Sequence, residues 1–331
     1  METERIEYID VLKFIGILFI YIGHYLDAAG LLYEFVFEFH VPLFFFISGC
    51  VESLKKEFSL KKKFISIMIP FYLFAIVSII IKVLVSGGNL HIIFEYLILV
   101  GKGCVRNTFF ASSLWFLSCL FVVNIIFAFI RKLKFISLMG VSSVGLFLLQ
   151  ILGTVKFPSY YNINSAMYYQ IYFVIGYMLF TPLNKILTSN RKKYRLGKWI
   201  SGGYAMIYSA LLFFKHNIYM MFEKFPVIKW FIPILTALTV IWFFFIISYF
   251  LKDISLFNEL GKSTLYFCGS EFMVKTVMYH LISIVAALKI ENGLAAILYS
   301  FFLLCISQKY LVPVERKALI NISNLIDNAH T

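Results

Sequence analysis

The sequence predicts an all-α fold, a polytopic bundle of about ten transmembrane helices with both termini in the cytoplasm. Composition is the first reason: the 331 residues are 61% hydrophobic and 19% aromatic, with a mean hydropathy of +0.87. A soluble domain is about 45–50% apolar and about 25% charged, whereas this chain is 14% charged. The second reason is that Lys and Arg are concentrated in every second connection between apolar runs, as they are in cytoplasmic loops.

Ten apolar runs are each long enough to cross about 30 Å of hydrocarbon as a helix. They lie at residues 6–26, 33–52, 64–85, 113–130, 135–155, 166–183, 199–215, 227–251, 263–288 and 293–312. The apolar segment from Leu90 to Val100 is too short to cross and is expected to be re-entrant or interfacial. We expect no appended soluble domain, and a single integral-membrane domain over residues 1–331.

The net charge of +13 and the five cysteines argue against two other classes of protein. The basic residues are spread through short connections and form no face of a soluble domain, so a nucleic-acid partner is not expected; contact with anionic lipid is a secondary consequence. The cysteines lack CxxC or CxxxH spacing, which favours packing residues over a metal site or a disulfide framework. The first apolar segment lacks a small-x-small cleavage site and is expected to stay in the mature chain.

The stretch "LKFIGILFIYIGHYLD", from Leu12 to Asp27, places two ionisable side chains, Lys13 and His24, in apolar surroundings. In an α-helix this spacing puts them on one face, about 16 Å apart along the axis. Ionisable groups at membrane depth usually face a bundle interior or a water-filled cavity and are functional candidates. Structural alternatives stay open: Asp10 can pair with Lys13 as a topology anchor, and His24 can be an interhelical hydrogen-bonding group.

The second span begins with polar residues in "YEFVFEFHVPLFFFISG", where Glu34, Glu38 and His40 precede the apolar run. Together with Asp27, these groups are expected at the depth of His24, across a short hairpin. Carboxylates beside an imidazole can orient it and raise its basicity, which a general base near neutral pH requires. The alternative is that they are hydrated loop residues.

Further motifs follow along the chain. The set comprises "DVLKFIGILFIYIGH" at 10–24, "VPLFFFISG" at 41–49, "KKKFISIMIPFY" at 61–72, "SLWFLSCLFVVN" at 113–124, "YFVIGYMLF" at 172–180, "LGKSTLYF" at 260–267 and "LLCISQKYLVP" at 303–313. In this order and over nearly the whole chain, they resemble the membrane acyltransferase-3 family. Its members acylate hydroxyl or amino groups of glycans and other acceptors, generally from acyl-CoA.

Three positions depart from the family pattern. Lys13 stands where Arg is commoner, which keeps the charge and loses bidentate geometry towards phosphate or carboxylate. Ser66 occupies a place where many relatives carry a second basic residue. The segment after "LGKSTLYF" usually ends in His and here reads "CGSE", so Glu271 must replace that His as acceptor or base, or its role is lost. Glu271 can also pair with Lys275, four residues further on.

The resemblance implies an enzyme that moves an acyl group, expected to be acetyl, from acyl-CoA to a hydroxyl of a cell-surface or lipid-linked glycan. His24 is expected to be the general base or to carry the acyl group transiently. The other catalytic candidates are Lys13 and Glu271. The candidates for binding the donor phosphates are Lys61, Lys62 and Lys63. The candidates for binding the acceptor or orienting His24 are Asp27, Glu38, His40 and Trp115.

The expected partners are acyl-CoA as co-substrate, the glycan acceptor and membrane lipid, with no bound cofactor and a homodimer left open. The high Lys, Ile and Phe content favours a bacterial plasma membrane. The rival function is a transporter or flippase for a lipid-linked saccharide, whose signature would be inverted repeats with broken helices in corresponding halves. A third interpretation, a structural membrane subunit, gives no reason for Lys13 and His24 on one face.

Overall fold

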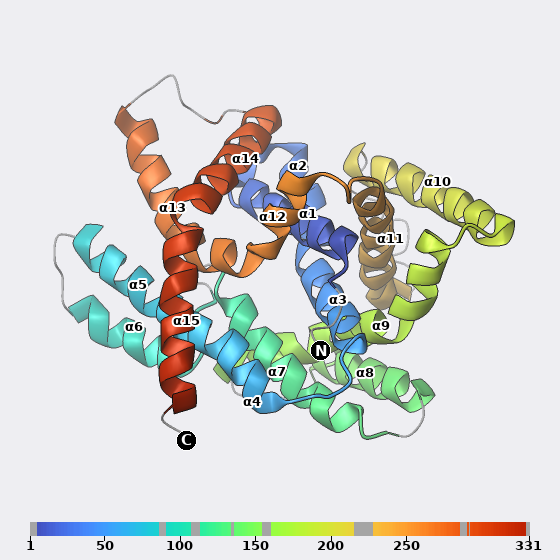
Figure 1. The fold of residues 1–331 in the computed structure, drawn as a ribbon, viewed down its shortest axis with the longest axis horizontal. Coiled ribbons are helices and arrows are strands. Elements are labelled where there is room, and N and C mark those ends of the chain that lie inside the picture. Colours follow the sequence, from blue (N-terminus) through green and yellow to red (C-terminus); the bar gives the residue numbers. More distant parts are fainter. Residues whose placement is uncertain are drawn as a thin grey trace. The chain divides into compact units, whose positions relative to one another are not determined.

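The predicted all-α fold is confirmed. The computed structural model describes residues 5–85, 91–106, 113–133, 136–153, 160–214, 228–284, 290 and 292–328, and every regular element in these ranges is a helix (Figure 1). The chain divides into two compact units. Unit 1 comprises Met1–Lys56, Tyr172–Thr264 and Ile290–Leu304, and unit 2 comprises Glu57–Ile171, Leu265–Lys289 and Cys305–Thr331.

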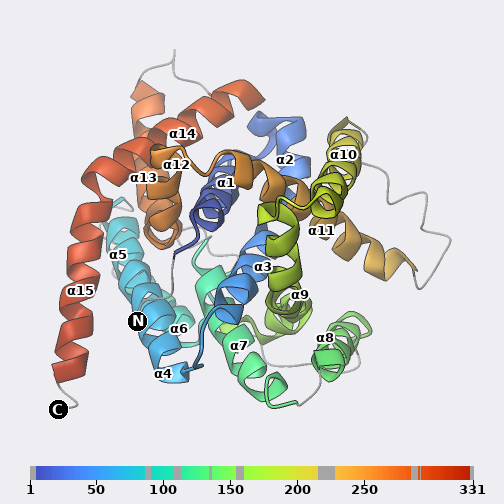
Figure 2. The same cartoon turned by 45° about the vertical axis from the view of Figure 1, so that its right-hand side comes forward.

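Unit 1 is arranged around one helix, α1 (Glu7–Gly23), which contacts four other helices of the unit (Figure 2). Those neighbours are α2 (Leu31–Phe37), α3 (His40–Ser53), α11 (Ile228–Phe250) and α12 (Ser255–Lys262). The other members are the 3-10 turn η1 (Leu26–Ala29), α10 (Lys192–Phe214), the part of α9 (Ile163–Thr188) from Tyr172 onward, and most of α14 (Gly293–Tyr310).

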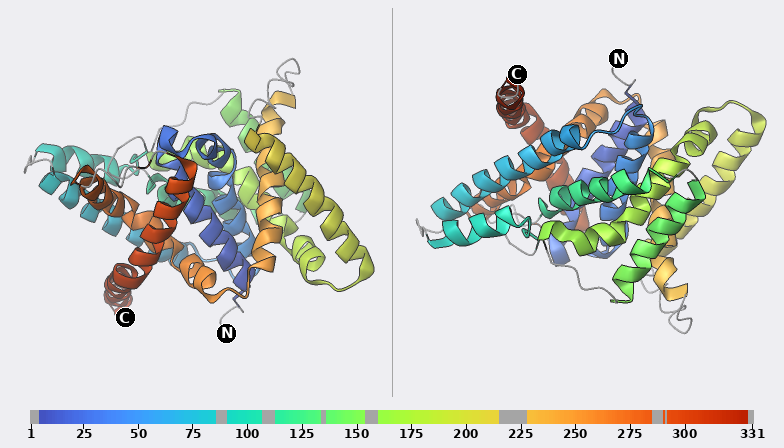
Figure 3. Two further views of the ribbon diagram at one scale, coloured as in Figure 1. Left: turned by 90° about the horizontal axis from the view of Figure 1, so that it is seen from above. Right: turned by 90° about the horizontal axis from the view of Figure 1, so that it is seen from below.

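Unit 2 contains the remaining helices. They are α4 (Leu60–Lys63), the π-helical turn η2 (Phe64–Met68), α5 (Ile69–Val85), α6 (His91–Gly101), α7 (Trp115–Ile130), α8 (Ile136–Ile151), the 3-10 turn η4 (Tyr160–Asn162), α13 (Thr264–Ile284) and α15 (Val312–Asn328). The short helix α6 lies alongside α5 (Figure 3).

Among the described residues, five helical segments are long and apolar enough to cross a membrane. They are Leu31–Ser53, Leu60–Val85, Tyr160–Thr188, Trp230–Phe250 and Gly293–Tyr310, and Trp115–Ile130 and Ser137–Ile151 are shorter apolar helices. The described parts of the ten predicted runs are mainly helical, but the run 33–52 is divided between α2 and α3 and the run 6–26 extends past the end of α1. Residues 135, 154–155, 215, 227 and 285–288 of those runs lie outside the described part of the chain. The count of ten spans and the cytoplasmic placement of the termini stay predictions.

The start of α5 shows how one proline shapes a span. Pro70 lacks an N–H, and its ring would clash with the carbonyl four residues earlier, at Ser66. The π-helical turn η2 lies immediately before it and spaces the backbone hydrogen bonds one residue further apart. Pro42 in α3 and Pro313 in α15 lie in first turns that continue no earlier helical turn, so they need no such adjustment because N–H groups are unpaired there anyway.

Helices α3 and α9 cross at a pair of glycines, so their backbones touch. A Cβ atom at Gly49 would collide with the backbone carbonyl of Phe173, and one at Gly176 would collide with the carbonyl of Phe46. Small residues permit this approach between membrane helices, where dispersion contacts drive association because lipid is as apolar as the helices. The contact gives a packing reason for the glycines of "PLFFFISG" and "YFVIGYMLF".

Gly176→Ala is therefore expected to lower the free energy of unfolding by about 1–3 kcal/mol, because the added methyl group forces the two backbones apart. Gly145→Ala in α8 is the matched control, since a Cβ atom there meets open space, and a helical Gly→Ala change then stabilises by about 0.5–1 kcal/mol. Thermal unfolding of both variants in the same detergent tests this. Equal melting temperatures for the two variants would contradict the close contact.

Candidate active site

Asp10 holds two cations at the start of α1. Its side chain is 2% exposed, and its two carboxylate oxygens lie 2.6 Å from Arg5 Nε and 3.0 Å from Lys13 Nζ. A buried carboxylate without partners would be costly, so the pairing explains why the charge is tolerated. The predicted Asp10–Lys13 pair is confirmed. Arg5 is a second partner that was not predicted, because it precedes the first apolar run. Two cations with one carboxylate leave this cluster with a net positive charge.

Helix α12 touches α1 at the same residue. A Cβ atom on Gly261 would collide with the backbone carbonyl of Asp10, and the ring of Phe257 stacks on that of Phe14 with centroids 4.7 Å apart. The glycine of "LGKSTLYF" is therefore needed where α12 approaches α1. The same turn of α1 is therefore fixed twice. The contact with α12 holds the backbone of Asp10, and the ion pairs hold its side chain.

His24 lies directly after the last residue of α1. The helix ends at Gly23, so the predicted run 6–26 is longer than the regular helix: Leu26 has a positive φ of 54°, and the 3-10 turn η1 reverses the chain. The backbone N–H of His24 still donates to the carbonyl of Ile20 at 3.1 Å, which is the α-helical pattern. This register preserves the spacing that places Lys13 and His24 on one face, about 16 Å apart along the axis.

Phenylalanine rings pack the α1 segment before His24. Phe19 makes edge-to-face contacts with Phe39 and Phe244 at centroid distances of 5.3 and 5.1 Å, and the rings of Phe39 and Phe244 stack at 5.1 Å. Such pairs stabilise by about 0.5–1.5 kcal/mol beyond the area they bury. The rings join α1 to α11 and to the turn before α3, and they give this part of unit 1 an apolar interior.

The four polar residues predicted to lie near His24 occupy different surroundings in the connection from η1 to α3. Asp27 in η1 and Glu34 in α2 are exposed, and Glu38 is half-exposed at the end of α2. His40 is 5% exposed, and its Nδ1 lies 2.7 Å from the carbonyl oxygen of Val36. Because a carbonyl only accepts, Nδ1 carries the hydrogen, and the neutral ring has its lone pair on Nε2. Their role in orienting His24 stays a prediction.

The three lysines predicted to bind the donor form a basic patch in unit 2 with one further cation. Ser59 caps α4 by accepting from the N–H of Lys62. Lys61 and Lys62 are exposed, while Lys63 Nζ lies 5.9 Å from the Phe58 ring centre and the guanidinium of Arg131 lies 4.9 Å from it. Arg131 comes from the end of α7, so only tertiary structure adds it to the patch. Clustered cations of this kind attract phosphate groups.

Trp115 belongs to a network at the start of α7. The guanidinium of Arg106 lies 4.3 Å from the indole ring centre and donates to the hydroxyl of Ser165. Asn162 Nδ2 donates to the Ser118 hydroxyl at 2.9 Å and to the Gly103 carbonyl at 3.1 Å. The sequence pattern indicated Trp115 but gave no signal for Arg106 or Asn162, which join the network only through tertiary structure.

Glu271 and Lys275 pair along α13, as their four-residue spacing predicts. The carboxylate is 1% exposed and lies 3.1 Å from the ammonium nitrogen. The preceding turn is fixed by the Ser113 hydroxyl, which donates to the Cys268 carbonyl at 2.7 Å. The catalytic role of Glu271 stays a prediction.

Comparison with known proteins bears on the whole chain. The sequence profile of one family, described as an acyltransferase domain (acyltransferase 3), matches residues 6–308. No curated protein and no solved structure was found to match the chain. The profile begins just after Arg5 and ends in α14, and so includes Asp10, Lys13 and every site residue predicted from the sequence. Because the match covers nearly its full length, the chain belongs to the acyltransferase-3 family of membrane acyltransferases.

Proposed function

We propose that this protein transfers an acyl group, acetyl in the first instance, from acyl-CoA to a hydroxyl group of a cell-surface or lipid-linked glycan. The observation that carries the proposal is the α-helical register that joins the Asp10–Lys13 ion pair to His24. This register supports the placement of a positively charged side chain, Lys13, and an imidazole, His24, on the same face of the helix. Membership of the family supports acyl transfer as the reaction.

His24 acts as the general base in this proposal. Its imidazole accepts the proton of the acceptor hydroxyl while the hydroxyl oxygen attacks the thioester carbonyl carbon. The bond from carbon to sulfur then breaks, and the CoA thiolate takes the proton back from the imidazolium. Lys13 lies about 16 Å from His24 along the helix axis, too far to contact the thioester carbonyl, so its proposed role is to attract a donor phosphate. The donor's arm then extends along the helix face from Lys13 to His24. Paired with Asp10, the Lys13 ammonium is restrained before the donor arrives.

The basic patch of Lys61, Lys62, Lys63 and Arg131 is the proposed binding site for the donor phosphates. CoA carries several phosphate groups, and phosphate favours clusters of cations. Trp115, with Arg106 held over its ring, is a candidate platform for a sugar ring of the acceptor. An aromatic face suits the apolar face of a sugar, and the guanidinium suits any acidic substituent.

His24→Gln is expected to lower kcat by about 10²–10⁴-fold, the usual contribution of general acid–base catalysis, with little change in acyl-CoA affinity. The measurement is CoA thiol release by the purified protein in the presence of acceptor, together with direct binding of the donor. His91→Gln in α6 is the control and should keep wild-type turnover. Wild-type kcat in His24→Gln would exclude His24 as the base.

Replacing Lys61, Lys62 and Lys63 together by Gln is expected to raise KM for acetyl-CoA and to leave kcat nearly unchanged, because only uniform binding is lost. The variant should discriminate less than wild type between acetyl-CoA and acetyl-pantetheine, which lacks the nucleotide phosphates. Its KM should also depend less on salt.

The matched control for this variant replaces three other exposed cations, Lys192, Lys193 and Arg195, by Gln. This control should keep both the preference for acetyl-CoA and the salt dependence. An equal rise of KM in the two triple variants would mean that net charge, and not this patch, attracts the donor.

A further inference from the structure

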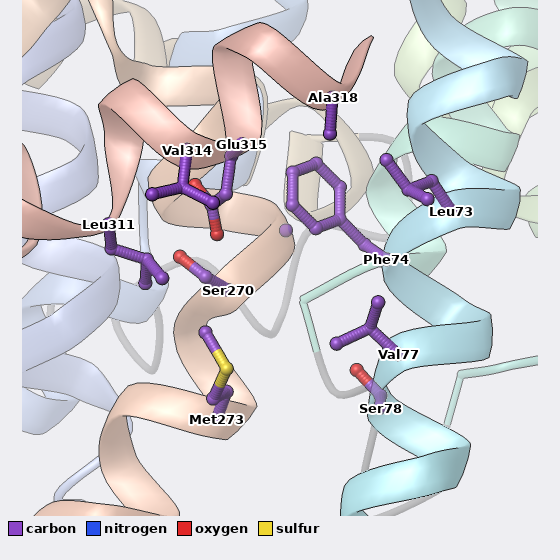
Figure 4. Close-up of a pocket in the computed structure, with 11 residues that line it drawn as sticks. Leu73, Phe74, Val77, Ser78, Ser270, Met273, Leu311, Val314, Glu315 and Ala318 are labelled. Carbon is purple, nitrogen blue, oxygen red and sulfur yellow. The ribbon is translucent and has the colours of Figure 1, made fainter. Parts of the chain in front are cut away.

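Unit 2 contains a pocket that the proposed reaction does not use. It has a volume of about 240 Å³ and lies between α5, α13 and the start of α15 (Figure 4). Its walls are apolar, formed by side chains such as Phe74, Val77 and Met273. The polar groups among its lining residues are the hydroxyls of Ser78 and Ser270 and the carboxyl of Glu315. In Figure 4 the Glu315 carboxyl extends from α15 toward Ser270.

The Glu315 carboxyl is incompletely satisfied. One oxygen, Oε2, is shielded from solvent and has no hydrogen-bond partner within the described part of the chain. The Ser270 hydroxyl is within reach of the carboxyl, but it also donates to the carbonyl of Tyr266 at 2.8 Å. Because a hydroxyl has a single hydrogen, Ser270 cannot serve both acceptors fully. A buried polar group of this kind indicates a ligand that completes its hydrogen bonding.

Burial keeps Glu315 protonated over part of the physiological range. Removal from water raises the pKa of its carboxyl to about 7, and the hydrogen bond from Ser270 offsets part of that rise. The other residues that line the pocket, from α5, α13 and α15, carry no ionisable group. Below pH 7 the group is therefore mainly a neutral acid, able to donate one hydrogen bond.

Charged residues close to Glu315 in the sequence or on neighbouring helices do not line the pocket. On α15, the guanidinium of Arg316 lies 5.6 Å from the ring centre of Tyr266, and with Lys317 it lines a separate groove. On α13, Glu271 pairs with Lys275. On α5, Lys82 lies outside the pocket lining, and on α14 so does Lys309, which lies over the ring of Tyr310.

The pocket adjoins surface that faces lipid in a membrane protein. Val77 is 36% exposed and Val314 is 65% exposed, and both line the pocket. The spanning helix α14 ends at Tyr310, and Glu315 follows five residues later near the start of the amphipathic helix α15. The end of a span marks the interfacial region, where amphipathic helices lie and where the ester groups of phospholipids are found.

We propose that this pocket binds one acyl chain of a membrane phospholipid, whose ester carbonyl accepts a hydrogen bond from the protonated Glu315 carboxyl. The apolar walls suit the chain, and the neutral acid suits an acceptor such as the ester carbonyl. This site is independent of the proposed function, because it involves neither His24 nor the basic patch.

The test is a titration of the full-length protein in detergent with phosphatidylcholine that carries a diazirine in the middle of one acyl chain. Illumination followed by peptide mapping should locate the label on α5 or α13 at the pocket. The lipid concentration that gives half-maximal labelling should rise roughly fivefold from pH 6 to pH 8.5, which is the effect of losing one hydrogen bond. Glu315→Gln should bind equally at both pH values, because its amide donates at either, and Glu315→Ala should bind weakly at both.

Ala318→Phe fills the pocket and should abolish the labelling, whereas Leu325→Phe, at an exposed position of the same helix outside the pocket lining, should not. Three results would overturn the proposal. They are wild-type binding that does not change with pH, Glu315→Gln that retains the wild-type pH response, and equal labelling in Ala318→Phe and Leu325→Phe. Binding that strengthens with pH would assign the pocket to a cationic ligand instead.

Discussion

Unit 1 depends on Asp10, where α1 is held by charge and by packing at one residue. The carboxylate binds Arg5 and Lys13, and the backbone carbonyl contacts α12 at the place where only Gly261 fits. Both constraints act on the first half of the helix. An α-helix is stiff over this distance. Anchoring α1 at Asp10 therefore also restricts the position of the backbone at His24. A site built on a rigid helix is more accurately placed than one on a loop.

Close backbone contact recurs in unit 1. The crossing of α3 and α9 at Gly49 and Gly176 has the same physical basis as the contact of α12 with α1. In a chain this apolar, the hydrophobic effect cannot select between helix pairs, since lipid and protein are equally apolar. Shape then determines which helices associate. The motifs that identify the family contain these glycines, so their packing role is explained without any part in chemistry.

Much of the fold could be predicted because its causes are local. Apolar runs of sufficient length form helices, and the three-residue and four-residue spacings of Asp10–Lys13 and Glu271–Lys275 give ion pairs. Interactions between distant segments could not be predicted in this way. Arg5 and Arg131 read as topological charges, yet one holds a buried carboxylate and the other joins the basic patch through Phe58. Neither the end of α1 before His24 nor the buried carboxyl of Glu315 has a signal in single-sequence periodicity.

In the proposed reaction, His24 removes a proton from a glycan hydroxyl during acyl transfer. The most direct measurement gives radiolabelled acetyl-CoA to membranes that contain the protein or its His24→Ala variant, and counts alkali-labile label in the glycan fraction. We expect label with the wild-type protein and its loss in the variant at equal protein abundance. Equal label in both membranes would contradict the claim.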